Sequence, residues 1–205
     1  MRRPLVSLAC LLLLAAATPA AGSDVDLSRA DGHLRGRFPL SVSLGAAGEA
    51  ALDTAARRAL ADWNTLARSA LGLAVFSEVP GPDAAVAVSV EPEDAARLMG
   101  QTFLRVDATG TITLPVRIEV LRPRARGQTA ADIVFYQVLA HELGHALGLA
   151  HTADPGSVMC CTRGGIDFND PAQRQAYVAG RRTPDLRTVE RQLAEHYARF
   201  WKRSP

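Results

Sequence analysis

The residues best suited to chemistry lie in one run of sequence, HELGHALGLAH, from 141 to 151. His141 and His145 are four residues apart, so on a helix their imidazoles lie on the same face, one turn apart. Two neutral imidazoles in this arrangement can bind one Zn²⁺. Glu142 lies one step round the helix, where its carboxylate can reach a water on the metal without binding the metal itself.

Gly148 follows three residues after His145 and is predicted to end this helix, because glycine adopts a left-handed conformation without a Cβ clash. The chain then turns back, and His151 can supply a third ligand. Three protein ligands leave the fourth position of a tetrahedral metal open, which is typical of a catalytic rather than a structural zinc site. The alternative is a helix that carries two histidines by chance. It is disfavoured because the spacing of Glu142, Gly148 and His151 would then also have to be a coincidence.

A second motif, Ser157-Val158-Met159, follows the histidines and resembles the Met-turn that lies beneath the zinc in metzincin metalloproteases. Thr152 after the third histidine and Asp154-Pro155-Gly156 before the methionine resemble the matrixin branch. The chain is similar to bacterial-style matrixins that lack a prodomain. The resemblance implies that Gly148 and Met159 support the metal site.

From the resemblance we expect an α+β (α/β-like) zincin catalytic domain. It would contain a twisted, mostly parallel five-stranded sheet, a long crossover helix, the zinc-motif helix and a C-terminal helix. The cysteine latch of a prodomain, Pro-Arg-Cys-Gly, is missing, and residues 23–36 are too few for such a domain. One catalytic zinc is expected; calcium is compatible with the family, but no specific motif supports it.

Two adjacent cysteines follow Met159, where matrixins commonly have Tyr-Pro. Cys161 occupies the place of a tyrosine that approaches the metal in the astacin and serralysin branches. A thiolate is a good zinc ligand, so one hypothesis is that Cys161 caps the open position in a redox-sensitive inactive state. The alternative is that Cys160 and Cys161 are structural or form a vicinal disulfide.

The chain has 205 residues, which suits one domain, expected at 37–203 after a flexible lead-in at 23–36. Residues 1–22 read as a signal peptide, with Arg2 and Arg3 before an apolar run and small residues at its end; a retained anchor is the alternative. Without those two arginines the basic residues equal the acidic ones in number, so no nucleic-acid partner is expected. We expect a monomer that is secreted, extracellular or periplasmic, with no membrane contact after cleavage.

Hydrophobic periodicity predicts a helix at 47–71 that ends at Gly72, with Trp63 in the core, and a last helix at 183–201 that begins at Thr183. Thr129 and Asp132 resemble a capping arrangement for the motif helix. Residues 164–182 are expected to be irregular and to wall a substrate pocket, and His33 and His196 to be solvated. The predicted strands lie at 38–44, 73–79, 84–90, 102–106 and 111–120, and the sequence does not decide which of the last two is the sheet edge.

These features predict a zinc-dependent endopeptidase in which zinc lowers the pKa of its bound water to about 7 and Glu142 is the general base. A protein or peptide substrate would bind in extended form along an edge strand. Two alternatives stay open: a catalytically silent, zinc-stabilised binding module on the same scaffold, and a zinc hydrolase of a non-peptide bond. The silent module is disfavoured because such modules typically lose the general base, which is present here.

Overall fold

The fold is that of a computed structural model, which describes residues 27, 31–93, 99–124, 129–161 and 165–203. The predicted signal peptide at 1–22 and residues 23–26 and 28–30 of the predicted lead-in lie outside the described residues. The sequence also suggests a short helical turn at 92–99, before Gly100, and most of that stretch lies outside the described residues. Among the described residues, no helix combines the length and the apolar character needed to cross a membrane.

The described strands form one sheet in the order β2-β1-β3-β5-β4. Neighbouring strands are parallel except for β4, which is antiparallel to β5. This confirms the predicted mostly parallel, five-stranded sheet and makes β4 one of its two edges. The strands are β1 (Leu40–Leu44), β2 (Phe76–Glu78), β3 (Val86–Glu91), β4 (Gly100–Val106) and β5 (Ile112–Leu121).

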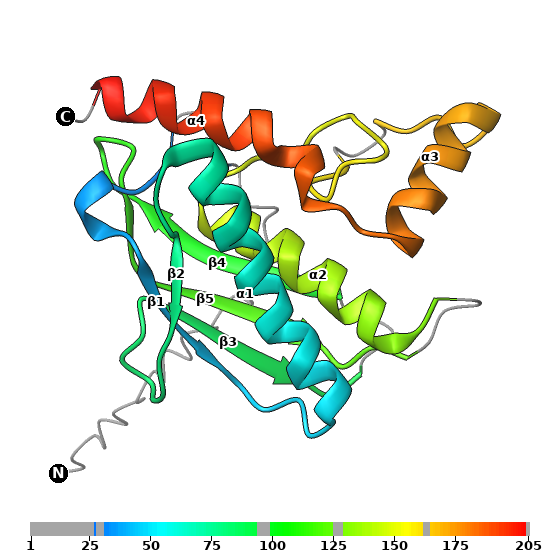
Figure 1. The fold of residues 1–205 in the computed structure, drawn as a ribbon, viewed down its shortest axis with the longest axis horizontal. Coiled ribbons are helices and arrows are strands. Elements are labelled where there is room, and N and C mark those ends of the chain that lie inside the picture. The colour runs from blue at the N-terminus through cyan, green and yellow to red at the C-terminus, as the bar shows by residue number, and fades with distance from the viewer. Residues whose placement is uncertain (1–26, 28–30, 94–98, 125–128, 162–164, 204–205) are drawn as a thin grey trace, which may run out of the picture.

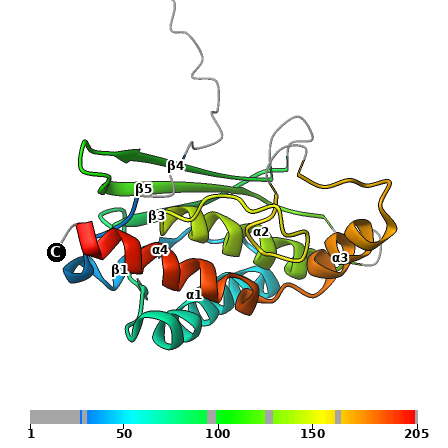
Figure 2. The same cartoon turned by 90° about the horizontal axis from the view of Figure 1, so that it is seen from above.

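The helices pack on one face of this sheet, so the domain has two layers (Figures 1 and 2). In the first view α1 and α2 cross the sheet side by side, α4 runs along one end of both, and α3 stands apart beyond α2. The α-helices are α1 (Ala50–Leu71), α2 (Ala131–Ala146), α3 (Pro171–Arg182) and α4 (Glu190–Arg203). The 3₁₀ turns are η1 (Arg35–Arg37) and η2 (Leu186–Val189).

The long helix α1 connects the parallel strands β1 and β2, as the crossover prediction required. It ends at Gly72, which adopts the predicted left-handed conformation with φ 73°. Trp63 is fully buried, and its Nε1 donates a hydrogen bond to the carbonyl oxygen of Ala140 at 3.0 Å. Because Ala140 immediately precedes His141, this contact fixes the motif helix against α1.

Three local predictions in the helical layer were wrong. Residues 171–182 form α3, because Asp170 caps a helix that has Pro171 at its first position. Thr183 ends α3, and the following turn begins instead at Asp185, whose carboxylate accepts from the backbone N–H of Arg187. The N-cap of α2 is Ala130, and no side chain caps that helix.

The turn signal at 107–110 indicates a hairpin between the strands at 102–106 and 111–120, and the sequence leaves open whether Pro115 marks a sheet edge or a break between two strands. Pro115 lies in β5, which is an inner strand between β3 and β4. The ladder to β4 shifts register between Phe103 and Arg105, at the level of Pro115. A proline is tolerated there because it removes no regular ladder hydrogen bond. Strand alternation would place Leu114 on the same face as the buried Ile112 and Val116, but Leu114 is exposed.

The described part of the lead-in is ordered and not loose, which corrects the prediction for residues 31–36. Gly32 forms a parallel bridge with Thr111, next to the start of β5. His33 is buried, and its Nε2 donates to the carbonyl oxygen of Ala146 at 2.8 Å. Trp201 of α4 donates through Nε1 to the carbonyl oxygen of His33 at 3.0 Å. This segment therefore joins the sheet, the end of α2 and α4.

His196 of α4 is also buried, so both histidines that were expected in solvent lie in the interior. Desolvation by burial lowers the pKa of each to about 4 from the usual 6.5. The reason for the error is that the partners are distant in sequence: His33 contacts α2 and α4, which no local pattern around residue 33 reveals.

We expect these two histidines to make the protein acid-labile. Both rings are neutral in the folded chain down to about pH 4, whereas in the unfolded chain they bind protons from about pH 6.5. The unfolded state therefore takes up protons first as the pH falls, and stability that is complete above 6.5 is lost toward 4, on the order of 3 kcal/mol per histidine.

Urea unfolding of metal-free protein at a series of pH values measures this loss. The His33→Gln variant should show a slope of unfolding free energy against pH that is smaller by up to about 1.4 kcal/mol per pH unit within the window. Equal slopes for the wild type and the variant would contradict the assignment to His33.

Candidate metal centre and active site

The three motif histidines converge at the end of α2. His141 and His145 lie on the same face of the helix, which ends at Ala146, and the chain then turns back to His151. The Nε2 atom of His141 lies 3.0 Å from that of His151, and the Nε2 atom of His145 lies 3.1 Å from each of the other two. Ligands on a tetrahedral zinc at about 2.0–2.1 Å are separated by roughly 3.3 Å, so this triangle has the size that the metal requires.

In two of these rings, the hydrogen bond made by Nδ1 determines whether Nε2 presents a lone pair or a proton to the centre of the triangle. His141 Nδ1 donates to the carbonyl oxygen of Val158 and His145 Nδ1 to that of Leu149, each at 2.8 Å. A neutral imidazole that donates from Nδ1 has a lone pair at Nε2. With a lone pair at both atoms, His141 Nε2 and His145 Nε2 cannot hydrogen-bond to each other, and the space between them suits a cation.

The ring of His141 is held neutral. Desolvation by burial is the main reason that its pKa falls to about 3, and the neighbouring His145 adds to the effect. A neutral ring at pH 7 is the form that binds a metal ion. In the described part of the chain, these three histidines form the one cluster of His, Cys, Asp and Glu side chains close enough to hold a metal.

Two glycines allow the backbone to approach the triad closely. Gly148 has φ 87°, and a Cβ at this position would also collide with the carbonyl oxygen of Asp31. A Cβ at Gly144, within α2, would collide with the Sδ atom of Met159. Met159 is fully buried, and its carbonyl oxygen accepts from the N–H of Thr152 at 3.0 Å. The predicted Met-turn thus packs directly beneath the motif helix.

Glu142 lies beside the triad but is not part of it. Its Oε2 accepts a hydrogen bond from Thr102 Oγ1 of β4 at 2.7 Å, and the same hydroxyl lies 3.0 Å from the Glu142 carbonyl oxygen. Desolvation by burial raises the pKa of the carboxyl to about 7, although the Thr102 hydrogen bond opposes the shift. Gly100 leaves room for this side chain, because a Cβ there would lie 2.7 Å from Oε1. A carboxyl with this pKa can accept and release a proton near neutral pH.

The same residues appear in the pattern of a known protein family. The family model for Matrixin (Peptidase_M10) matches residues 45–169, which is more than half of the chain. The chain belongs to the matrixin family. No curated protein sequence matches it. Family membership and the histidine triad together support a zinc metalloprotease.

A cavity of about 400 Å³ opens beside the triad of this matrixin. It extends from α2 to α3, and Gly100, the first residue of β4, contributes to its wall. The segment after the Met-turn therefore does line a pocket, as predicted, although it does so as a helix. The lining residues are Met99, Gly100, Thr129, Val134, Gln137, Val138, His141, Glu142, Cys160, Tyr177 and Arg181.

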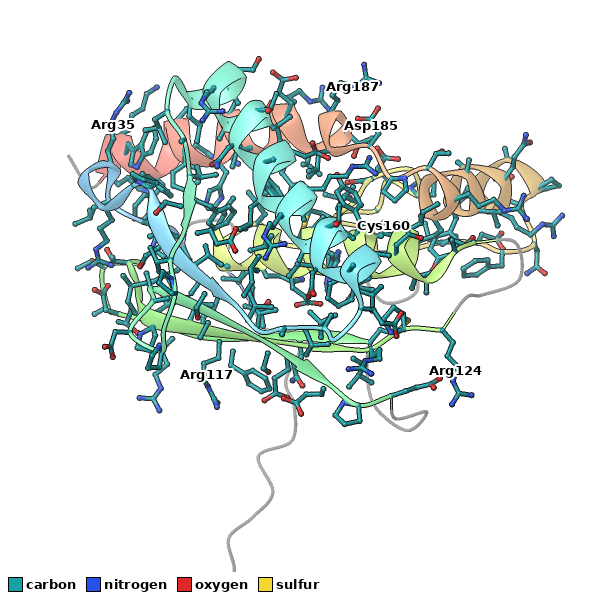
Figure 3. The ribbon with its side chains drawn as sticks, turned by 60° about the horizontal axis from the view of Figure 1, so that its bottom comes forward. Arg35, Arg117, Arg124, Cys160, Asp185 and Arg187 are labelled. Carbon is teal, nitrogen blue, oxygen red and sulfur yellow. A yellow bond between two sulfur atoms is a disulfide. The ribbon has the colours of Figure 1, made fainter. Side chains whose placement is uncertain are left out.

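The two cysteines after Met159 are bonded to each other as a vicinal disulfide. In this bonded form Cys161 has no thiolate to offer a metal, and the hypothesis that it caps the open position in another redox state stays a prediction. The bridged pair corresponds to the alternative that the sequence left open. Cys160 lies where the loop after α2 comes close to α3 (Figure 3), and its carbonyl oxygen accepts from Arg181 Nη2 at 3.0 Å.

Several residues that shape the site escaped the sequence analysis. Thr102 and Gly100 belong to a strand that is about forty residues away from Glu142 in sequence, and Asp31 belongs to the segment expected to be loose. Gly144, which contacts Met159, was also missed. It is the one residue of the four with a local signal in the sequence, because a glycine inside a helix costs stability and indicates a close contact.

Proposed function

We propose that this matrixin is an exported zinc endopeptidase that hydrolyses internal bonds of extended peptides, with Glu142 as its general base. The observation that carries the proposal is the position of the Glu142 carboxyl. It lies buried against β4, one residue from a metal ligand, in a cavity that His141 also lines. When bound, zinc polarises a carbonyl oxygen and acidifies a coordinated water.

Glu142 accounts for the movement of protons in this reaction. Its carboxylate takes a proton from the attacking water as the oxygen bonds to the scissile carbonyl carbon. The same group then gives that proton to the amide nitrogen as the C–N bond breaks, so that the product leaves as an amine. Thr102 keeps one carboxylate oxygen occupied, which directs the other toward the cavity and makes Thr102 a positioning residue.

The edge strand supports an extended substrate. One side of β4 pairs with β5, and the other side is the margin of the sheet. An edge strand has backbone N–H and C=O groups that can pair with a peptide. Because β4 also carries Thr102, a peptide along this edge would pass the Glu142 carboxyl. Export rests on the sequence of residues 1–22, and N-terminal sequencing of the protein recovered outside the cell would test it.

Removal of the metal is expected to abolish cleavage. Purified protein with bound zinc is incubated with a mixture of unblocked and end-blocked peptides, and products are identified by mass spectrometry. We expect cuts at internal bonds, a loss of at least about 100-fold in rate with excess chelator, and recovery when zinc is restored. A cleavage rate that does not change when the chelator is added would refute a zinc peptidase. Well-folded, zinc-loaded protein that cuts nothing would favour the silent binding module.

A further inference from the structure

We propose that Arg181 makes the cavity beside His141 and Glu142 selective for an acidic side chain, so that the enzyme cleaves next to aspartate or glutamate. This inference rests on the proposed peptidase function and names its substrate class. Arg181 lies on α3, at 171–182, which is outside the stretch at 45–169 that matches the family model. The proposed selectivity is therefore a property of this chain's own helix.

The first argument for an acidic substrate side chain is the distribution of charge in the cavity. Val134 and Val138 give it apolar surface on α2, and among the described residues that line it Glu142 and Arg181 are the two with a formal charge. The Glu142 carboxylate is hydrogen-bonded to Thr102 on β4. A substrate side chain that enters the cavity away from Glu142 therefore meets the positive charge of Arg181.

The partners of Arg181 hold the guanidinium without neutralising it. Nη2 donates to the carbonyl oxygen of Cys160 at 3.0 Å, and the guanidinium carbon lies 4.6 Å from the centre of the Tyr177 ring. The Gln137 amide faces Nε and Nη1, which are both donors; with its oxygen turned toward them, that oxygen accepts from Nε at 3.0 Å and also from Nη1. All three partners are neutral, and no carboxylate forms an ion pair with Arg181 in the part of the chain that the structure describes.

The guanidinium retains capacity for a ligand. These contacts use three of its five N–H groups, which leaves one on each terminal nitrogen. Two such groups match the two oxygens of a carboxylate, the geometry in which arginine binds acids best. A lysine side chain would meet a like charge, and an amide would gain hydrogen bonds without the ion pair.

Gln137 connects the Arg181 guanidinium to the helix that carries the metal ligands. It is buried, and it lies one helical turn before His141 on α2. Because Gln137 holds the guanidinium, Arg181 has a fixed position relative to the metal ligands before any substrate binds. A side chain that is ordered in advance loses little conformational entropy on binding, so the selectivity should appear in the binding of the substrate and of the transition state alike.

Matched peptides test the proposal by turnover. The best-cleaved peptide from the mixture is made with Glu, Gln or Lys at each position that flanks the cut. At one of these positions the wild type should give a kcat/KM about tenfold higher for Glu than for Gln, and lower still for Lys. In Arg181→Gln the Glu-to-Gln ratio should fall to about one, and in Arg181→Glu the order of Glu and Lys should reverse. Arg182→Gln, at the exposed neighbouring position, is the matched control and should keep the ratio.

A measurement without turnover separates this proposal from the peptidase function. The zinc-loaded Glu142→Ala protein is immobilised and presented with pools of N-acetylated, C-amidated hexapeptides, each with Glu or Gln fixed at one position. At one fixed position, the Glu pool should be retained more strongly than the Gln pool, and adding Arg181→Gln should remove the difference. Thermal unfolding and zinc content show that each variant is folded.

The outcomes are distinct. Cleavage without any acidic preference, together with equal retention of both pools, would overturn the role of Arg181 and leave the peptidase intact. Retention of the Glu pool by the variant, together with a zinc-loaded wild type that cuts no peptide, would support Arg181 and refute the peptidase. Equal retention with no cleavage would refute both.

Discussion

Replacing Glu142 by alanine is expected to reduce kcat by about 10²- to 10⁴-fold, the usual contribution of a general acid–base group, while zinc stays bound. The reason is that, among the described residues that line the cavity, Glu142 has the one carboxylate that can take the proton from water. Zinc retention follows from the triad, which consists of histidines alone and keeps its backbone partners at Val158 and Leu149.

The fold should survive this change. The Thr102 hydroxyl loses the carboxylate but still lies 3.0 Å from the Glu142 carbonyl oxygen, so no buried donor is left unpaired. Removal of a buried carboxyl that is costly to ionise can even stabilise the chain. The measurements are kcat, zinc content and thermal unfolding. Asp132→Asn, at the other end of α2, is the control and should retain activity. Near-normal turnover of Glu142→Ala would exclude Glu142 as the base.

The metal site of this matrixin could be predicted from its sequence because its essential residues are close together along the chain. His141 and His145 meet through the helical repeat alone, and a glycine at 148 suffices to bring back His151 within three residues. Helical periodicity and glycine conformation are short-range properties, so the triad, its turn and the helix that carries them could all be predicted. The parallel sheet and crossover helix followed from the family resemblance.

The features that could not be predicted depend on contacts between segments that are distant in sequence. The Thr102 hydroxyl reaches Glu142 from β4, His33 reaches the end of α2 from the N-terminal segment, and Arg181 reaches Gln137 from α3. None of these pairs has a spacing that a periodic pattern could reveal. Asn169-Asp170-Pro171 is a turn signal and favoured the irregular segment expected there. The same three residue types can also begin a helix, and here Asp170 accepts from the N–H groups of Ala172 and Gln173 and begins α3.

Replacing Gly148 by alanine is expected to destabilise the folded protein by at least about 2 kcal/mol and to weaken zinc binding. A left-handed conformation costs a non-glycine residue about 1–2 kcal/mol, and Gly148 has φ 87°. A Cβ would in addition collide with the carbonyl oxygen of Asp31, a backbone atom that cannot turn aside. The bend that presents His151 must therefore open, which separates the third ligand from the other two.

Thermal unfolding and competition with a chelator for zinc measure the two effects. Gly156→Ala is the control in the same loop, since its Cβ would meet nothing closer than Asp154 Oδ1 at 3.5 Å, an ordinary contact; it should bind zinc normally. Gly148→Asn separates the two causes, because asparagine tolerates the left-handed region but still has a Cβ. If asparagine is as harmful as alanine, the contact with Asp31 dominates. If asparagine restores stability and zinc binding, the backbone conformation alone requires glycine, and the N-terminal segment does not constrain the metal site.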